Sequence, residues 1–159
     1  MKNYMMLLVL CVAMTGFNKS HQKSGSPDPV THTGDTTKRI EPWTAKQLMA
    51  PADLAFIIND PNKKQPVIIC VGPGALIKGS MDMGPANEKE NLEKLKKQLS
   101  TLSRNANIVI YCGCCPFEHC PNIRPAFILI NEMKFSNARL LNIEHNLKTD
   151  WIAKGYPKA

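Results

Sequence analysis

Short apolar runs alternate with helical periodicities along the chain after residue 40. Runs at 66–71, 107–111 and 139–143 are too short for core helices and predict buried strands. Glycine and proline residues close the first two runs. Between them, leucines recur at helical spacing with lysines on the intervening positions, which predicts an amphipathic helix whose lysines face water; the leucines are Leu92, Leu95, Leu99 and Leu102.

Further helices are predicted from capping residues and apolar spacing. Thr44 can cap a first short helix, and Pro125 is tolerated in the first turn of a later one. The predicted helical segments are 44–48, 51–58, 124–133 and 149–153, and in the third we expect Phe127, Ile128 and Ile130 to face the core. Strands joined through helices predict an α/β fold, with a mostly parallel central sheet of about five short strands and helices on both faces.

The first 16 residues have the pattern of a secretory signal peptide: an early lysine, a short apolar run and small residues after it. A polar stretch at 17–39 follows and predicts a flexible linker, which leaves 40–159 as one folded domain. We therefore expect a secreted or periplasmic protein without an integral membrane span once the signal is removed. Bulky Leu10 disfavours lipid attachment at Cys11, the alternative to ordinary cleavage.

The charge of the chain narrows the choice of partners. The formal net charge is +7, but the lysines are scattered and aromatic residues make up only 6% of the 159 residues. A nucleic-acid surface would need clustered cations and aromatic stacking platforms, so no nucleic-acid partner is predicted. The positive charge is compatible with attraction of small anions. The sequence identifies no protein partner.

Four of the six cysteines fall within nine residues, directly after the predicted strand at 107–111; they are Cys112, Cys114, Cys115 and Cys120. In open α/β sheets this is the end of a strand at which chemistry is usually placed. Four inert thiols in one loop would be a liability in an oxidising compartment, so the cluster predicts a chemical role. Cys70 lies mid-strand and is predicted to be a small buried apolar residue.

Cys112 is the first candidate nucleophile because the strand end fixes its position. A cysteine attacks as the thiolate, and a loop between strand and helix directs backbone N–H groups and the positive helix end toward it. Arg124 opens the following helix and can add a positive charge. These features predict a lowered pKa for Cys112 and a site for an anion.

Two other chemistries remain open for this loop. Cys112, Cys114, Cys115, His119 and Cys120 offer five soft ligands within nine residues. The two separated ligand pairs typical of zinc are absent, whereas copper(I) accepts two or three thiolates in a compact loop. A disulfide from Cys112 or Cys115 to Cys120 would instead give a redox relay or a resolving step, while adjacent Cys114 and Cys115 are sterically unsuited to pair.

From residue 43 to residue 157 the chain resembles a single-domain rhodanese. Residues 67–71 resemble the first core strand of that family, residues 76–80 stand where the family has a His-Ile-Pro-Gly-Ala turn, and residues 108–112 resemble its active-site strand. Trp151 with the run Gly155-Tyr156-Pro157 resembles the closing motif. These matches come in the order that the family shows, which is more specific than any one of them.

The resemblance implies a sulfurtransferase. In that family a cysteine at the end of the central strand takes a sulfane sulfur as a persulfide and passes it to an acceptor. By position Cys112 would carry the sulfur and Arg124 would support the anion. The implied sulfur donor is a small anion such as thiosulfate, and the implied acceptor is a thiol or cyanide. The resemblance implies no cofactor. Copper or zinc would bind only under the alternative hypothesis of a metal-binding thiol module.

The chain departs from the family pattern at the active loop. Cys112 to Arg124 spans thirteen positions, whereas the family loop has about six residues and one cysteine. Cys114, Cys115 and Cys120 are therefore additional thiols, and Cys120 is a second candidate for the sulfur carrier. Cys70 and Gly72 stand where the family has Asp and Arg, so the anchoring of the loop does not follow from the resemblance.

Overall fold

The computed structural model describes residues 40–159. The predicted signal peptide at 1–16, the predicted linker at 17–39 and Cys11 lie outside these residues. Among the helices described, none combines the length and apolar character that crossing a bilayer requires.

Five parallel strands form one sheet in the order β1-β5-β4-β2-β3. The strands are β1 (Leu48–Met49), β2 (Val67–Cys70), β3 (Ser80–Asp82), β4 (Ile108–Tyr111) and β5 (Ala138–Leu141). Every residue of β4 is buried, as expected for a central strand covered on both faces. The α/β class and the five-stranded parallel sheet predicted from the apolar runs are confirmed.

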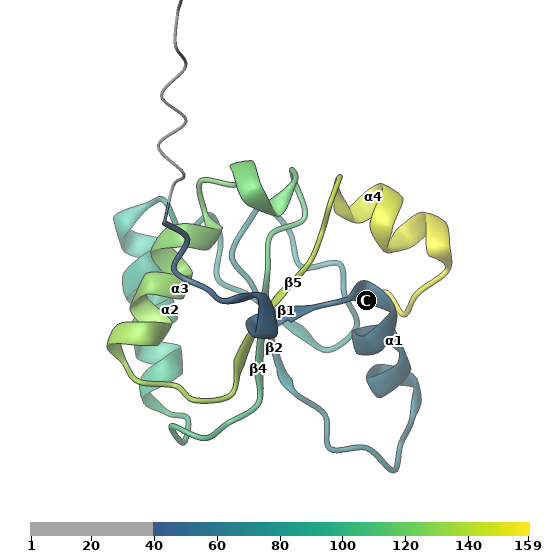
Figure 1. The fold of residues 1–159 in the computed structure, drawn as a ribbon, viewed down its shortest axis with the longest axis horizontal. Helices are drawn as coiled ribbons and strands as arrows, with labels where there is room; N and C mark the ends of the chain where they lie inside the picture. The colour runs from purple at the N-terminus through teal and green to yellow at the C-terminus, as the bar shows by residue number, and fades with distance from the viewer. Residues whose placement is uncertain (1–39) are drawn as a thin grey trace, which may run out of the picture. The chain divides into compact units, whose positions relative to one another are not determined.

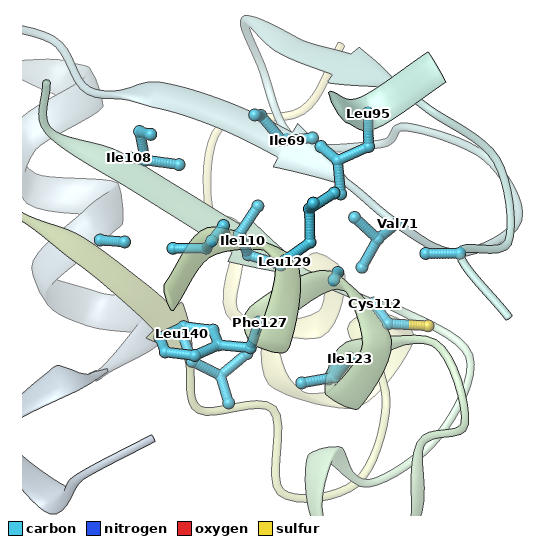
Figure 2. Packing of buried hydrophobic residues seen from close by; sticks show 14 of the residues in the cluster. Ile69, Val71, Leu95, Ile108, Ile110, Cys112, Ile123, Phe127, Leu129 and Leu140 are labelled. Atoms are coloured by element: carbon cyan, nitrogen blue, oxygen red, sulfur yellow. The ribbon is translucent and has the colours of Figure 1, made fainter. Parts of the chain in front are cut away.

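Helices cover both faces of the sheet (Figure 1). α2 (Lys89–Ser100) and α3 (Ile123–Glu132) pack on one face, and α1 (Pro51–Asn59) and α4 (Leu147–Asp150) pack on the other. Short 3-10 turns occur at η1 (Ala45–Gln47), η2 (Phe117–His119) and η3 (Ile152–Lys154). Figure 2 shows the α2/α3 side of the core, where Cys112 packs beside Val71 and Ile123.

Two edge strands and one helix face differ from the sequence predictions. Leu48 begins β1 rather than ending a helix, and β3 was not predicted, because strands of two and three residues are too short for a periodicity to register. Ile128 is 46% exposed, although we expected it in the core with Phe127 and Ile130. Those two residues lie on the buried face of α3, and Ile128 points away from that face.

Tyr111 joins the central strand to the segment that follows β2. Its hydroxyl oxygen accepts hydrogen bonds from the backbone N–H groups of Leu76 (3.2 Å) and Ile77 (3.3 Å), and it lies 3.0 Å from Ser80 Oγ. Burial raises the pKa of Tyr111 to about 12, so the hydroxyl stays neutral at physiological pH. These contacts fix Tyr111, the residue before Cys112, to the segment from Leu76 to Ser80.

The closing segment packs against the α1/α4 face. Trp151 is fully buried, and its indole N–H donates to the carbonyl of Pro157 at 2.9 Å. The ring of Tyr156 meets the Trp151 ring edge-on, with the centroids 5.2 Å apart. Trp151 therefore belongs to the core on this face of the sheet, and Tyr156 packs against that core.

Candidate functional site

Cys112 lies directly after β4 and is fully buried. Its sulfur occupies space beside the backbone of Gly72, at the end of the neighbouring strand β2. A Cβ atom added to Gly72 would stand 2.4 Å from Cys112 Sγ, far inside van der Waals contact. The missing side chain of Gly72 therefore makes room for the Cys112 sulfur.

The loop that follows is fixed to the rest of the domain at two points. The carbonyl of Gly113 accepts a hydrogen bond from the N–H of Leu147 at the start of α4 (3.0 Å). The N–H of Phe117 donates to the carbonyl of Ile143 after β5 (2.9 Å), and the Phe117 ring packs near Trp43. Both hydrogen bonds therefore hold the long loop to the segment between β5 and α4.

Four sulfur atoms meet in this loop. The Sγ atoms of Cys112, Cys114, Cys115 and Cys120 all lie within 4.8 Å of one another. Cys112 Sγ is 3.3 Å from Cys114 Sγ, which is 3.1 Å from Cys115 Sγ. Cys112 and Cys120 are buried, Cys115 is half-buried and Cys114 is exposed, and none of the four is in a disulfide. The cluster thus connects a buried strand end to the surface.

The surroundings of Cys112 favour its thiolate. A hydrogen bond from the Cys120 thiol has the largest effect and outweighs burial, which acts in the opposite direction. The backbone N–H of Cys114 and the side chain of Asn122 add further donors. Together they lower the pKa of Cys112 to about 5, so this sulfur carries a negative charge at neutral pH.

The neighbouring thiols are shifted the other way. Burial, together with the adjacent sulfurs of Cys115 and Cys112, raises the pKa of Cys114 to about 12. Cys120 donates to Cys112, which raises the pKa of Cys120, and burial adds to this effect. One thiolate is therefore surrounded by neutral thiols, and the negative charge is located on Cys112.

Asn122 is a site residue that sequence reasoning missed. It is 4% exposed and precedes α3, and its Nδ2 lies 3.6 Å from Cys112 Sγ. Its Oδ1 accepts a hydrogen bond from the N–H of Asn87 at 3.2 Å, which orients the amide. An asparagine before a helix is usually interpreted as a cap. Here the side chain makes no capping bond and turns toward the thiolate instead.

Arg124 contacts an anchoring carboxylate in this structure. Its Nη2 lies 2.5 Å from Glu41 Oε1 and 2.6 Å from the carbonyl oxygen of Glu118, and the guanidinium stands over the Trp43 ring. These contacts hold the loop to the segment before β1. The support of an anion by Arg124 stays a prediction. His119 is exposed, and the four-sulfur group does not include it.

A surface depression of about 530 Å³ lies beside Cys114. Its lining is largely apolar, and Lys148 is its one charged residue; the lining residues are Pro73, Gly74, Leu76, Gly113, Cys114, Asn146, Leu147, Lys148 and Ile152. Lys148 is exposed on α4. The depression could hold a small anion next to the exposed thiol of the cluster.

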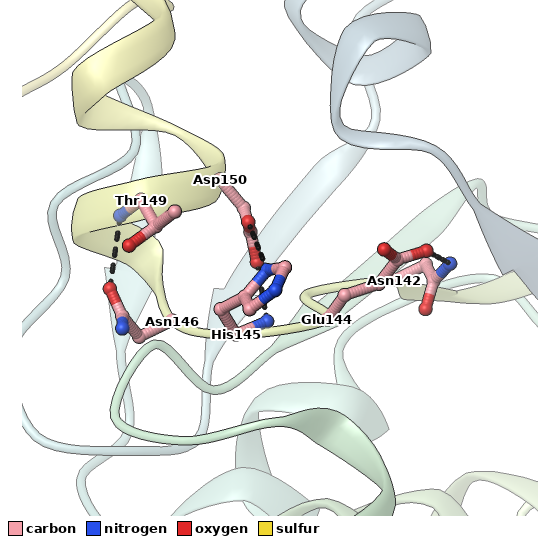
Figure 3. A network of polar contacts seen from close by, with 6 residues as sticks. All are labelled: Asn142, Glu144, His145, Asn146, Thr149 and Asp150. Atoms are coloured by element: carbon pink, nitrogen blue, oxygen red, sulfur yellow. Dashed lines mark hydrogen bonds and ion pairs between the residues drawn. The ribbon is translucent and has the colours of Figure 1, made fainter.

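A polar network orients α4 at the edge of this depression (Figure 3). Asn146 Oδ1 accepts from the N–H of Thr149 at 2.9 Å and caps the helix. The carboxylate of Asp150 accepts from the backbone N–H of His145 (2.7 Å) and lies 3.0 Å from His145 Nδ1. Burial raises the pKa of Asp150, but the hydrogen bonds from His145 outweigh it, and the net pKa is lowered.

No protein-family model matches the chain, and no curated protein matches it either. Among solved structures the chain is similar to two variants of EanB, each in complex with hercynine. In one variant a cysteine is replaced by serine, and in the other two cysteines are replaced by alanine. Each comparison gives 18% identity and a TM-score of 0.48, covering 71% of this chain and 27% of the EanB chain. The chain thus spans about a quarter of the length of EanB.

Proposed function

We propose that the protein is a rhodanese-like sulfurtransferase that carries sulfane sulfur as a persulfide on Cys112. The observation that carries this proposal is the position of the Cys112 sulfur at the carboxyl end of the central strand, with hydrogen-bond donors of Cys114, Cys120 and Asn122 directed at it. A stable thiolate is what nucleophilic attack on sulfur requires. The same donors can stabilise the charge of a persulfide, which is also an anion.

The chemistry needs no redox partner when thiosulfate is the donor. The Cys112 thiolate attacks the outer sulfur of thiosulfate, the sulfur–sulfur bond of thiosulfate breaks, and sulfite leaves with the electron pair of that bond. Cyanide or an acceptor thiolate then attacks the terminal sulfur of the persulfide. Thiocyanate or the acceptor persulfide forms, and the Cys112 thiolate is restored.

Cys114 provides the route between Cys112 and solvent in this proposal. Cys112 is fully buried, whereas Cys114 is exposed and its sulfur lies 3.3 Å away. The depression beside Cys114 would hold the donor, and the charge of Lys148 would attract it. In this proposal sulfur therefore passes the Cys114 thiol on its way to Cys112.

The test is intact mass spectrometry of reduced, chelator-treated protein after incubation with thiosulfate. We expect a gain of one sulfur atom per chain, loss of this adduct on addition of cyanide, and release of sulfite in the first step. Cys112→Ser should remove the adduct. Cys70→Ser is the matched control, because Cys70 is also buried but its thiol donates to backbone carbonyls outside the cluster.

Two outcomes would contradict the proposal. An adduct that survives in Cys112→Ser and disappears in Cys120→Ser would assign the sulfur to Cys120 instead. Loss of two hydrogen atoms without any sulfur gain would indicate a disulfide relay. Circular dichroism of each variant establishes that it is folded before its mass is interpreted.

A further inference from the structure

The composition of the cysteine cluster is that of a site for a thiophilic cation. Its members offer four sulfur ligand atoms, and the group contains neither a carboxylate nor an imidazole. Calcium and magnesium take oxygen ligands, whereas zinc and copper(I) take thiolates. From this donor set we infer that the protein binds one closed-shell thiophilic cation, Zn²⁺ or Cu⁺, through Cys112, Cys114, Cys115 and Cys120.

The spacing of the sulfurs fits such a cation. A zinc ion held at about 2.3 Å from four thiolates separates the sulfur atoms by about 3.8 Å. The observed separations include 3.1 and 3.3 Å, and none of the four sulfurs is more than 4.8 Å from another. The observed separations therefore lie on both sides of the spacing that four zinc-bound thiolates need, and the protons of the neutral thiols leave to solvent as the cation enters.

N–H groups are already aimed at the sulfurs that the cation would use. Asn122 Nδ2 and the N–H of Cys114 are directed at Cys112, and the N–H groups of Asn122 and Ile123 are directed at Cys120. Zinc with four thiolates carries a net negative charge, and N–H donors around the sulfurs stabilise such a centre. The formal net charge of the chain is +7, so the remaining charges of the protein do not repel such an anionic centre.

The two cations differ in the number of thiolates that they need. Zinc in a structural site takes four ligands, so it requires every member of the cluster. Copper(I) is satisfied by two or three thiolates. A three-thiolate copper(I) site could therefore form from Cys112, Cys114 and Cys120, without the half-buried Cys115.

Bound cation and persulfide would exclude each other, since both use Cys112. The cation would therefore protect the thiolate from oxidation and switch sulfur transfer off until it is removed. Cation binding itself does not depend on sulfur transfer. It is tested by whether the protein retains the metal, and this is measured without any sulfur donor.

The experiment loads the reduced full chain anaerobically with one equivalent of Zn²⁺ or of Cu⁺ and removes free metal by gel filtration. Mass spectrometry of the metal content should give one cation per chain, and competition with a chromophoric chelator gives the affinity. Co²⁺ used as a probe should show thiolate charge-transfer bands and the intense visible bands of tetrahedral coordination.

Single cysteine variants test which sulfurs bind each cation. Cys114→Ser and Cys115→Ser are decisive because these positions are not fully buried, so the fold should tolerate the change. If the cation is Zn²⁺, each should weaken binding by at least about tenfold. If it is Cu⁺, Cys114→Ser weakens binding and Cys115→Ser retains it. Cys70→Ser, outside the cluster, should bind as the unchanged protein does.

The inference is overturned if the protein retains neither Zn²⁺ nor Cu⁺ at one cation per chain. Retention that no cluster variant weakens, or that Cys70→Ser abolishes, overturns it as well. The proposed sulfur transfer is measured separately, in chelator-treated protein, by the gain of one sulfur atom. If either metal retention or sulfur gain is not observed, the other measurement can therefore still be interpreted.

Discussion

At the scale of single residues, the site consists of one thiolate and the groups that stabilise it. The sequence predicted a role for Cys112 at the end of a strand, and the residue does lie directly after β4. Asn122 and Gly72 were not identified, because their roles arise from contacts between distant segments of the chain. An asparagine before a helix and a glycine after a strand have ordinary local explanations, and only the packed structure shows their second partner.

Replacement of Asn122 by alanine should raise the pKa of Cys112. The side chain donates to Cys112 Sγ at 3.6 Å, and a hydrogen bond to a charged group is worth about 1.5 kcal/mol or more. We therefore expect an increase of about one pH unit above the present value of about 5. The measurement is the thiolate absorbance of chelator-treated protein as a function of pH. An unchanged midpoint in folded protein would show that the amide does not stabilise the thiolate.

Gly72→Ala should remove persulfide formation while leaving the domain folded. The new Cβ would stand 2.4 Å from Cys112 Sγ, so the sulfur has to leave its position among the donors. Gly74→Ala is the comparison, because a Cβ there meets nothing within 4 Å, although its left-handed backbone, with φ of 78°, disfavours alanine. We expect both variants to lose some stability and only Gly72→Ala to lose the sulfur adduct. Equal adduct formation in the two variants would contradict this reading.

At the scale of elements, α4 contributes to the site although it has only four residues. Its first N–H holds the carbonyl of Gly113, and Lys148 lines the depression beside Cys114. Apolar periodicity could not have found this contribution. The sequence predicted a helix at 149–153, whereas α4 begins at Leu147 and is set by the Asn146 cap. The helices predicted at 51–58 and 124–133 lie within one residue of α1 and α3, whereas α2 ends at Ser100, before the Leu102 that the leucine spacing included.

Lys148→Glu should weaken the use of an anionic donor and leave the chemical step intact. Reversal of the charge beside Cys114 repels thiosulfate, so KM should rise by about threefold or more, with kcat little changed. The effect should shrink at high ionic strength. Lys154→Glu makes the same change in net charge at a residue that does not line the depression. A similar rise of KM in both variants would show a general field effect rather than a binding site.

Ionisation of the Asp150 carboxyl group should make the stability of the α4 region depend on pH. Its pKa is lowered in the fold because the hydrogen bonds from His145 outweigh burial, so the native state favours the ionised form. This stabilisation is present above the unfolded pKa and is lost as the pH falls through the lower folded value. Asp150→Asn should therefore lower Tm by about 2 °C at neutral pH, and this difference should shrink as the pH falls below the unfolded pKa of the carboxyl group. A Tm difference that persists in acid would contradict the assignment.

At the scale of the whole molecule, the segment before β1 is tied to the cysteine loop. Arg124 joins Glu41 and the carbonyl of Glu118, while its guanidinium stands over the Trp43 ring. The sequence placed Arg124 at the start of a helix and could suggest only a role toward the nearby thiolate. The α/β architecture followed from local periodicity, whereas this link joins residues 83 positions apart, which no local pattern encodes.

Paired substitutions at this link should separate anchoring from direct support of an anion by Arg124. If Arg124 anchors the loop, Arg124→Gln and Glu41→Gln should slow persulfide formation to a similar degree. Their effects on the free energy of unfolding should be coupled by about 1 kcal/mol in a double-mutant cycle, since removal of either partner leaves the other without its ion pair. If Arg124 instead binds the donor, Arg124→Gln should raise KM for thiosulfate far more than Glu41→Gln does. We expect the anchoring result, because Nη2 of Arg124 already contacts a carboxylate and a carbonyl, and the guanidinium lies over an aromatic ring.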